Sequence, residues 1–235
     1  MKYKHLFFDL DRTLWDFDSN FIETFKEIFT KFSLEQNGIP SLEAFTTTYI
    51  GHNDRLWDLY RNDKISKEEL RDTRFIITLN DFGINNVALA NEISEEYIFI
   101  SPRKGILMPG TIEVLEQLKN EYHLHIITNG FEEIQKVKME YAGLNDYFDC
   151  IVTSEEAGSK KPDNRIFNYA LEKAGAKVTE SIMIGDDFEV DILGATSIGM
   201  DTIFYDPKNT ERVDQMSTYR VTHLTELLSL LERKN

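Results

Sequence analysis

The sequence predicts an α/β protein: a parallel sheet covered by helices on both faces, with a smaller helical domain inserted after the first strand. Short apolar runs suited to buried strands alternate with helix-length segments along most of the chain. Glycine directly follows three of those segments, which is common at helix ends because glycine accepts a positive φ. Residues 16–100 break the alternation, since they are strand-poor and helical in pattern.

The strands and helices of the predicted sheet domain can be placed by residue. Five apolar runs are predicted as strands, at residues 4–10, 123–128, 150–153, 181–184 and 202–205. Three segments that end at a glycine are predicted as helices, at residues 131–142, 164–174 and 188–198. A further apolar segment at 224–231 is typical of a helix that caps the end of a domain.

The helical region defines a second predicted domain. We predict an α/β core at residues 1–15 and 101–235 and a helical cap at residues 16–100. Within the cap, four apolar side chains recur at helical spacing, which favours a packed stripe: Phe25, Ile28, Phe29 and Phe32. An insertion at this point is expected to lie over the carboxyl ends of the strands, where open α/β sheets bind ligands.

Composition and charge exclude several classes of protein. The 235 residues include 41 acidic and 26 basic side chains, a formal charge of −15 at pH 7, which disfavours nucleic-acid polymers and anionic membranes as partners. The single cysteine, Cys150, rules out a disulfide scaffold, and no apolar run approaches the roughly 18 residues of a membrane helix. The first apolar stretch ends at Asp9, too early for a signal peptide, so we predict a cytoplasmic protein.

Two carboxylates follow the first predicted strand, at Asp9 and Asp11. Residues i and i+2 of a strand point the same way, so both side chains face one site if the strand continues. Carboxylates this close repel each other unless a cation or a shared proton lies between them. On this pair alone, solvated acids at a strand end are an open alternative.

Three later segments at strand ends favour a site for phosphate and metal. Thr128, Asn129 and Gly130 lead from a strand into a helix and offer a hydroxyl and backbone N–H groups to an anion, although a simple turn fits the same residues. Residues 158–163 place ammonium groups before another helix, with solvated lysines as the alternative. Asp186, Asp187 and Asp191 place three carboxylates at a third strand end, a cluster that a divalent cation with oxygen ligands would stabilise.

Together these segments resemble the signature motifs of the haloacid dehalogenase (HAD) superfamily. The resemblance covers residues 7–199 and includes Asp-x-Asp-x-Thr from Asp9, a strand-terminal Thr128, Lys161 before proline, and Gly-Asp-x-x-x-x-Asp from Gly185. It implies a Rossmann-like sheet in the order 3-2-1-4-5, with the helical insertion as a C1-type cap.

The resemblance also implies a role for each residue of the site. Asp9 is the expected nucleophile that takes the phosphoryl group, and Asp11 the acid that protonates the leaving oxygen and then activates water. Thr128, the Asn129 amide and Lys161 are expected to hold the phosphoryl oxygens. Lys161 is chosen because the lysine of the motif stands directly before proline.

Mg²⁺ is the expected cofactor. The resemblance implies Asp9, Asp186 and the backbone carbonyl of Asp11 as its ligands, with Asp187 or Asp191 supporting the ion directly or through water. A divalent ion offsets the repulsion between these carboxylates and a phosphate monoester dianion, which is why we expect chelation to abolish activity.

The activity that the resemblance implies is phosphoric monoester hydrolysis through an aspartyl-phosphate. Residues 16–19, 128–131 and 154–156 look most like the pyrimidine 5′-nucleotidases of the superfamily, so a small phosphorylated metabolite, a mononucleotide above all, is the expected partner. We expect a monomer or a weak homodimer.

Recognition of the rest of the substrate is predicted less directly. Trp15, Phe17 and Trp57 are candidates to stack on a base, although aromatic side chains in a helical insertion are more often core. Arg12 departs from the pattern of many relatives, which carry glycine there. The motif uses the backbone at this position, so the chemistry is expected to survive.

Other functions fit parts of the same pattern. A phosphatase of another small ester such as phosphoglycolate, or a sugar-phosphate mutase, would share the core residues and differ in the cap. A dehalogenase needs neither a second acid nor a metal, so Asp11 and Asp186 argue against it. A receiver-type phosphoprotein would be much shorter and carry its aspartate on the middle strand, whereas Asp149 here lies at the wrong end of that strand.

Overall fold

The structure, a computed structural model, describes residues 2–209 and 217–232. Its contacts divide the chain into two compact units: Met1–Phe17 with Gly105–Asn235, and Asp18–Lys104. The first unit carries the sheet and the second is helical. For comparison, the sequence places the ends of the cap at residues 16 and 100.

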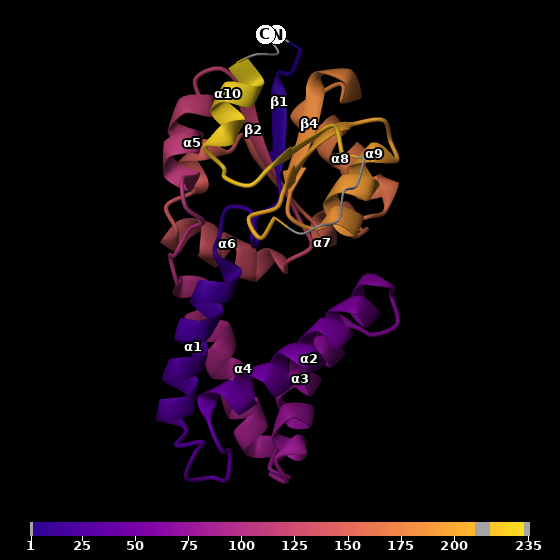
Figure 1. The fold of residues 1–235 in the computed structure, drawn as a ribbon. Helices are drawn as coiled ribbons and strands as arrows, with labels where there is room; N and C mark the ends of the chain where they lie inside the picture. Colours follow the sequence, from indigo (N-terminus) through magenta and orange to yellow (C-terminus); the bar gives the residue numbers. More distant parts are fainter. Residues whose placement is uncertain (1, 210–216, 233–235) are drawn as a thin grey trace. The chain divides into compact units, whose positions relative to one another are not determined.

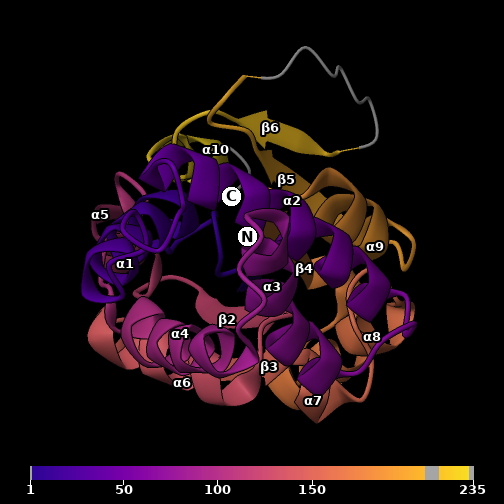
Figure 2. The same cartoon turned by 90° about the horizontal axis from the view of Figure 1, so that it is seen from below.

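The sheet of the first unit is parallel throughout and runs in the order β3-β2-β1-β4-β5-β6 (Figure 1). Its strands are β1 His5–Phe8, β2 His123–Thr128, β3 Cys150–Thr153, β4 Ser181–Gly185, β5 Asp201–Tyr205 and β6 Tyr219–Val221. The predicted α/β class and the order of the first five strands are confirmed. The short β6, which the sequence does not predict, extends the sheet beyond β5 (Figure 2).

Both faces of the sheet are buried because alternate side chains of each strand enter different apolar clusters. In β1, Leu6 and Phe8 pack on one side and Phe7 on the other. Helices α5 Thr111–Leu118 and α10 Glu226–Glu232 cover the first face, and α8 Asn164–Ala174 covers the second (Figure 1).

The other elements of this unit follow the strands that they leave. Helix α6 Glu132–Tyr141 comes after β2, and α7 Ser154–Ala157 after β3. The predicted helix after β4 is a π-helical segment, η4 Phe188–Leu193, continued by α9 Gly194–Thr196. Among the described helices, none is both long and apolar enough to cross a lipid bilayer.

The helical unit consists of α1 Phe17–Lys31, α2 Leu42–Arg61, α3 Lys67–Asp81 and α4 Val87–Ile100. Three of these helices begin at a side-chain cap, and the cap of α3 is a reciprocal pair between Ser66 and Glu69. The core is aromatic: the ring of Phe25 lies 5.1 Å from that of Phe45, and Tyr49 lies 4.8 Å from Phe75. Of the predicted stripe, Phe25 and Ile28 are fully buried in the cap, whereas Phe29 and Phe32 are half-buried.

His125 of β2 is buried beside His5 of β1 and Cys150 of β3. His125 lies with Nε2 3.1 Å from Nδ1 of His5 and with Nδ1 3.2 Å from Sγ of Cys150, and its ring tilts against Phe7. Burial, with a smaller contribution from His5, lowers the pKa of His125 from 6.5 to about 4.

This histidine is expected to make the fold acid-sensitive. Between pH 6.5 and about pH 4, His125 is protonated in the unfolded chain but neutral in the folded chain. Protonation therefore favours the unfolded state, and the free energy of unfolding falls as the pH drops through this range. The loss amounts to at most about 3 kcal/mol. Urea unfolding at pH 7.5 and pH 5 should show wild type losing about 2 kcal/mol more than His125→Gln. Equal losses in the two proteins would contradict this prediction.

Candidate active site

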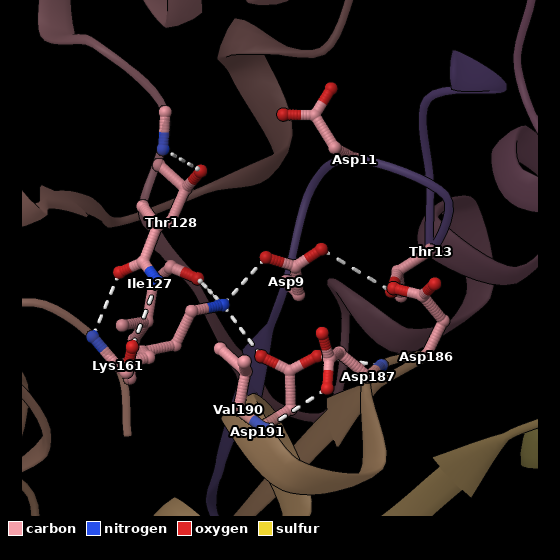
Figure 3. A network of polar contacts seen from close by, with 12 residues as sticks. Asp9, Asp11, Thr13, Ile127, Thr128, Lys161, Asp186, Asp187, Val190 and Asp191 are labelled. Carbon is pink, nitrogen blue, oxygen red and sulfur yellow. Dashed lines mark hydrogen bonds and ion pairs between the residues drawn. The ribbon is translucent and has the colours of Figure 1, made fainter. Parts of the chain in front are cut away.

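The candidate site lies at the carboxyl ends of three neighbouring strands. Asp9 directly follows β1, Thr128 ends β2 and Asp186 directly follows β4. Because β1 pairs with both β2 and β4, these residues meet although they are far apart in the sequence (Figure 3). The backbone N–H of Asp9 donates to the carbonyl oxygen of Ile184 at 2.9 Å, which continues the β1–β4 pairing up to the site.

Lys161 lies in the middle of this arrangement and is 1% exposed. Its Nζ donates to Oδ1 of Asp9 and to Oδ1 of Asp191, both at 2.6 Å, and to the carbonyl oxygen of Ile127 at 2.8 Å. Burial alone would lower the pKa of Lys161, but the two carboxylates outweigh it and raise the pKa. The ammonium group is thus charged, and its three protons all have acceptors.

Asn129 fixes the backbone of Lys161. Its Nδ2 donates to the carbonyl oxygen of Lys161 at 2.9 Å, and its Oδ1 accepts from the backbone N–H of Lys161 at 2.8 Å. Both ends of the Asn129 side-chain amide are thus engaged by the backbone of Lys161. We therefore expect the backbone N–H of Asn129, and not its side chain, to contact phosphate.

Three carboxylates converge beside Lys161. Oxygens of Asp9, Asp186 and Asp191 all lie within 4.8 Å of one another. The hydroxyl of Thr13 is 3.3 Å from Oδ1 of Asp186 and 3.5 Å from Oδ2 of Asp9, so it bridges two of them. Asp191 can approach only because position 185 is glycine: a Cβ there would lie 2.3 Å from Oδ2 of Asp191.

The pKa values of these carboxylates show the cost of bringing them together. Burial, only partly offset by Lys161, raises the pKa of Asp9 to about 7. Burial, with repulsion from Asp9 and Asp191, raises the pKa of Asp186 well above its ordinary value, and burial raises that of Asp191. A cation among the three side chains would remove this penalty.

The structure separates the roles of Asp187 and Asp191, which the sequence leaves open. Oδ1 of Asp187 accepts from the backbone N–H groups of Glu189 and Val190, so this side chain caps η4. The backbone N–H of Asp187 donates to Oδ2 of Asp191 at 3.1 Å. Asp191 joins the carboxylate cluster, whereas Asp187 supports the segment that carries it.

Asp11 points away from the cluster, toward α6 (Figure 3). Its Oδ2 accepts from Nε2 of Gln135 at 2.8 Å, and its Oδ1 accepts from Nζ of Lys138. Burial alone would raise the pKa of Asp11, but Lys138 and Gln135 outweigh burial and lower it. The prediction that Asp9 and Asp11 face the same way thus fails for their side chains in this structure, because β1 ends at Phe8 and the backbone turns before Asp11.

The predicted base-stacking residues occupy different environments. Trp15 is fully buried in the apolar cluster of the first unit, so we assign it a packing role. Phe17 is half-buried, and the Arg12 guanidinium lies 4.3 Å from its ring centre. Trp57 is half-buried on α2 and meets Tyr60 edge-to-face.

Three further residues contact the site and have no role predicted from the sequence: Thr13, Gln135 and Lys138. Thr13 is the threonine of the Asp-x-Asp-x-Thr motif, so its presence near the acids follows from the pattern. Gln135 and Lys138 lie three residues apart on the helix after Thr128, a spacing that puts both on one helix face. That spacing predicts a shared helix face, but it does not predict that this face contacts Asp11.

Comparison with known proteins identifies the family. A model of the haloacid dehalogenase-like hydrolases matches residues 3–199. The chain belongs to this family. The predicted superfamily is therefore confirmed. Two relatives named pyrimidine 5′-nucleotidases confirm the closer resemblance as well.

Several relatives of this HAD protein match over nearly their whole length. It is 32% identical over 236 residues to the pyrimidine 5′-nucleotidase PynA of Streptococcus pneumoniae, covering 99% of this chain and 97% of the relative. It is 34% identical over 233 residues to the pyrimidine 5′-nucleotidase YjjG of Escherichia coli, covering 98% and 99%. A crystal structure of the HAD-hydrolase YfnB of Bacillus subtilis bound to magnesium matches with a TM-score of 0.86 at 27% identity, covering 99% and 100%.

Proposed function

We propose that this protein is a Mg²⁺-dependent phosphoric monoester hydrolase that works through an aspartyl-phosphate on Asp9. The observation that carries the proposal is the convergence of Asp9, Asp186 and Asp191 around the buried ammonium group of Lys161. A carboxylate nucleophile beside a fixed positive charge is the arrangement that phosphoryl transfer needs.

The donor set suits magnesium. Three carboxylates with oxygens within 4.8 Å of one another offer the hard oxygen ligands that Mg²⁺ prefers. Burial raises the pKa of each of them, and a bound cation would offset that cost. Asp9, Asp186 and Asp191 would hold the ion, with the backbone carbonyl of Asp11. Once bound, it would supply positive charge to neutralise the oxygens of the phosphoryl group.

The chain's own residues divide the reaction into two steps. A carboxylate oxygen of Asp9 forms a bond to phosphorus as the ester P–O bond breaks. Asp11, which must first leave Lys138 and take up a proton, gives that proton to the leaving oxygen. Asp11 then takes a proton from water as the water oxygen attacks phosphorus, and the bond between phosphorus and Asp9 breaks. Throughout, Lys161 holds Asp9 in place, while Thr128 and the backbone of Asn129 bind phosphoryl oxygens.

Nucleoside 5′-monophosphates, pyrimidine nucleotides above all, are the proposed substrates. Two relatives with this activity in their names match 98% or more of the chain. A second candidate class is small sugar phosphates, since a glyceraldehyde 3-phosphate phosphatase of Methanothermobacter thermautotrophicus is 32% identical over 213 residues, covering 88% of each chain. Either class fits the expectation of a cytoplasmic enzyme with a small phosphorylated metabolite as partner.

A phosphate-release screen with Mg²⁺ tests this proposal. The substrates are the pyrimidine and purine nucleoside 5′-monophosphates, glyceraldehyde 3-phosphate, phosphoglycolate and a hexose 1-phosphate. We expect kcat/KM for a pyrimidine nucleotide to exceed that for every non-nucleotide ester by about tenfold or more, a difference of about 1.4 kcal/mol in transition-state binding. A preference for one of the small esters would replace the substrate class. Hexose phosphate isomerisation without phosphate release would point to a mutase.

A further inference from the structure

Both oxygens of the Asp11 carboxylate are held by side chains of α6. Gln135 contributes one N–H to Oδ2 and Lys138 one to Oδ1. These two donors are 1% and 6% exposed, so they are ordered parts of the interior and not mobile surface groups. The Asp11 carboxylate is therefore paired with α6 and turned away from the carboxylate cluster.

The same amide of Gln135 also sets the hydrogen bonding of Thr128. Nε2 of Gln135 and the backbone N–H of Gly130 both donate to Oγ1 of Thr128, at 2.8 Å and 3.1 Å. A hydroxyl has two acceptor positions and one proton. Since both acceptor positions are filled, the proton of Thr128 is left to donate, and a phosphoryl oxygen is an acceptor of the kind that it requires.

Two features of the sequence keep Gln135 and Lys138 where they are. Position 130 is glycine, and a Cβ there would lie 1.9 Å from Nε2 of Gln135, so the amide occupies space that any other residue would fill. The ammonium group of Lys138 lies 4.2 Å from the ring centre of Trp15, the buried aromatic residue described above. This cation–π contact holds Lys138 on the side of Asp11.

We propose that Gln135 is a positioning residue of this enzyme. Gln135 fixes Thr128 as a donor to the phosphoryl group. The proposal rests on the phosphatase function above and deepens it, because it names the residue that orients the phosphate-binding hydroxyl.

A double-mutant cycle tests whether Gln135 acts through Thr128. Gln135→Met removes the amide at similar volume and Thr128→Val removes the hydroxyl; inhibition by inorganic phosphate reports binding. We expect each single variant to weaken phosphate binding about tenfold or more, as for a lost hydrogen bond to a charged group. The double variant should be no weaker than Thr128→Val alone. Effects that multiply would overturn the proposal, because Gln135 would then act independently of Thr128.

The matched control is Lys136→Met, which removes an exposed ammonium group from the same helix. Lys136 pairs with Glu132, and its side chain is 72% exposed. We expect this variant to bind inorganic phosphate as tightly as wild type, and a loss like that of Gln135→Met would overturn the assignment. Absence of phosphate release by wild type would instead contradict the proposed function, so the two failures are distinguishable.

Discussion

Asp9→Asn is expected to lower kcat for phosphate release by at least about 10⁴-fold, because the amide cannot attack phosphorus. The fold should survive the change. Asn has the shape of Asp, and its oxygen can still accept from Lys161, which keeps its bond to Asp191. Burial and repulsion from Asp191 raise the pKa of Asp9 to about 7, so its charged form is costly in the folded protein. Asn removes that charge, and the variant should therefore melt at the wild-type temperature or above it.

Steady-state phosphate release and differential scanning calorimetry measure the two parts of this expectation. Asp163→Asn, purified in parallel, is the control: Asp163 caps α8 at the surface, and Asn caps helices equally well. That variant should have wild-type activity and set the background from contaminating phosphatases. Asp9→Asn activity within about 100-fold of wild type would exclude Asp9 as the nucleophile.

Removal of divalent cations is expected to abolish phosphate release and to lower the melting temperature. The folded chain holds Asp9, Asp186 and Asp191 together, whereas the unfolded chain separates them, so Mg²⁺ binds the folded state in preference. At a Mg²⁺ concentration 100 times its Kd the gain is about 2.7 kcal/mol. For a chain of this size that corresponds to about 5–10 °C.

Two substitutions at neighbouring positions sharpen the metal experiment. Asp186→Asn should remove both the activity and the Mg²⁺-dependent rise in melting temperature, since it takes one carboxylate from the cluster. Asp187→Asn should keep most of that rise, because Asp187 caps η4 and Asn preserves the cap. Robust turnover in excess chelator, or identical melting with and without Mg²⁺, would refute the assignment.

The positions of Asp9, Thr128 and Asp186 follow from the sequence because each stands at the end of a strand, and parallel strands present those ends along one edge of a sheet. The direction of Asp11 does not follow. It depends on Lys138, 127 residues further along the chain, and on a turn after β1 that strand periodicity does not describe. Contacts of this kind join segments that are far apart in the sequence, so a local sequence pattern does not identify Lys138 as the partner of Asp11.

Elements were harder to place where local signals were weak. β6 has three residues, too few for an alternating pattern to stand out. The sequence predicts an ordinary helix at 188–198, whereas the segment after β4 winds as a π-helix over Phe188–Leu193. The buried carboxylate of Asp191, against Gly185, lies within that segment, and wider windings of this kind are frequent at functional sites.

The ammonium group of Lys161 joins three separate segments of the chain. It donates to Asp9 after β1, to Ile127 near the end of β2 and to Asp191 in η4. Loss of that group leaves the buried carboxylates of Asp9 and Asp191 without their positive partner, which lowers the free energy of unfolding by several kcal/mol. A survey that scores variants by cellular abundance should therefore rank position 161 among the worst tolerated, so that protein quality control removes such variants before any defect in turnover is measurable.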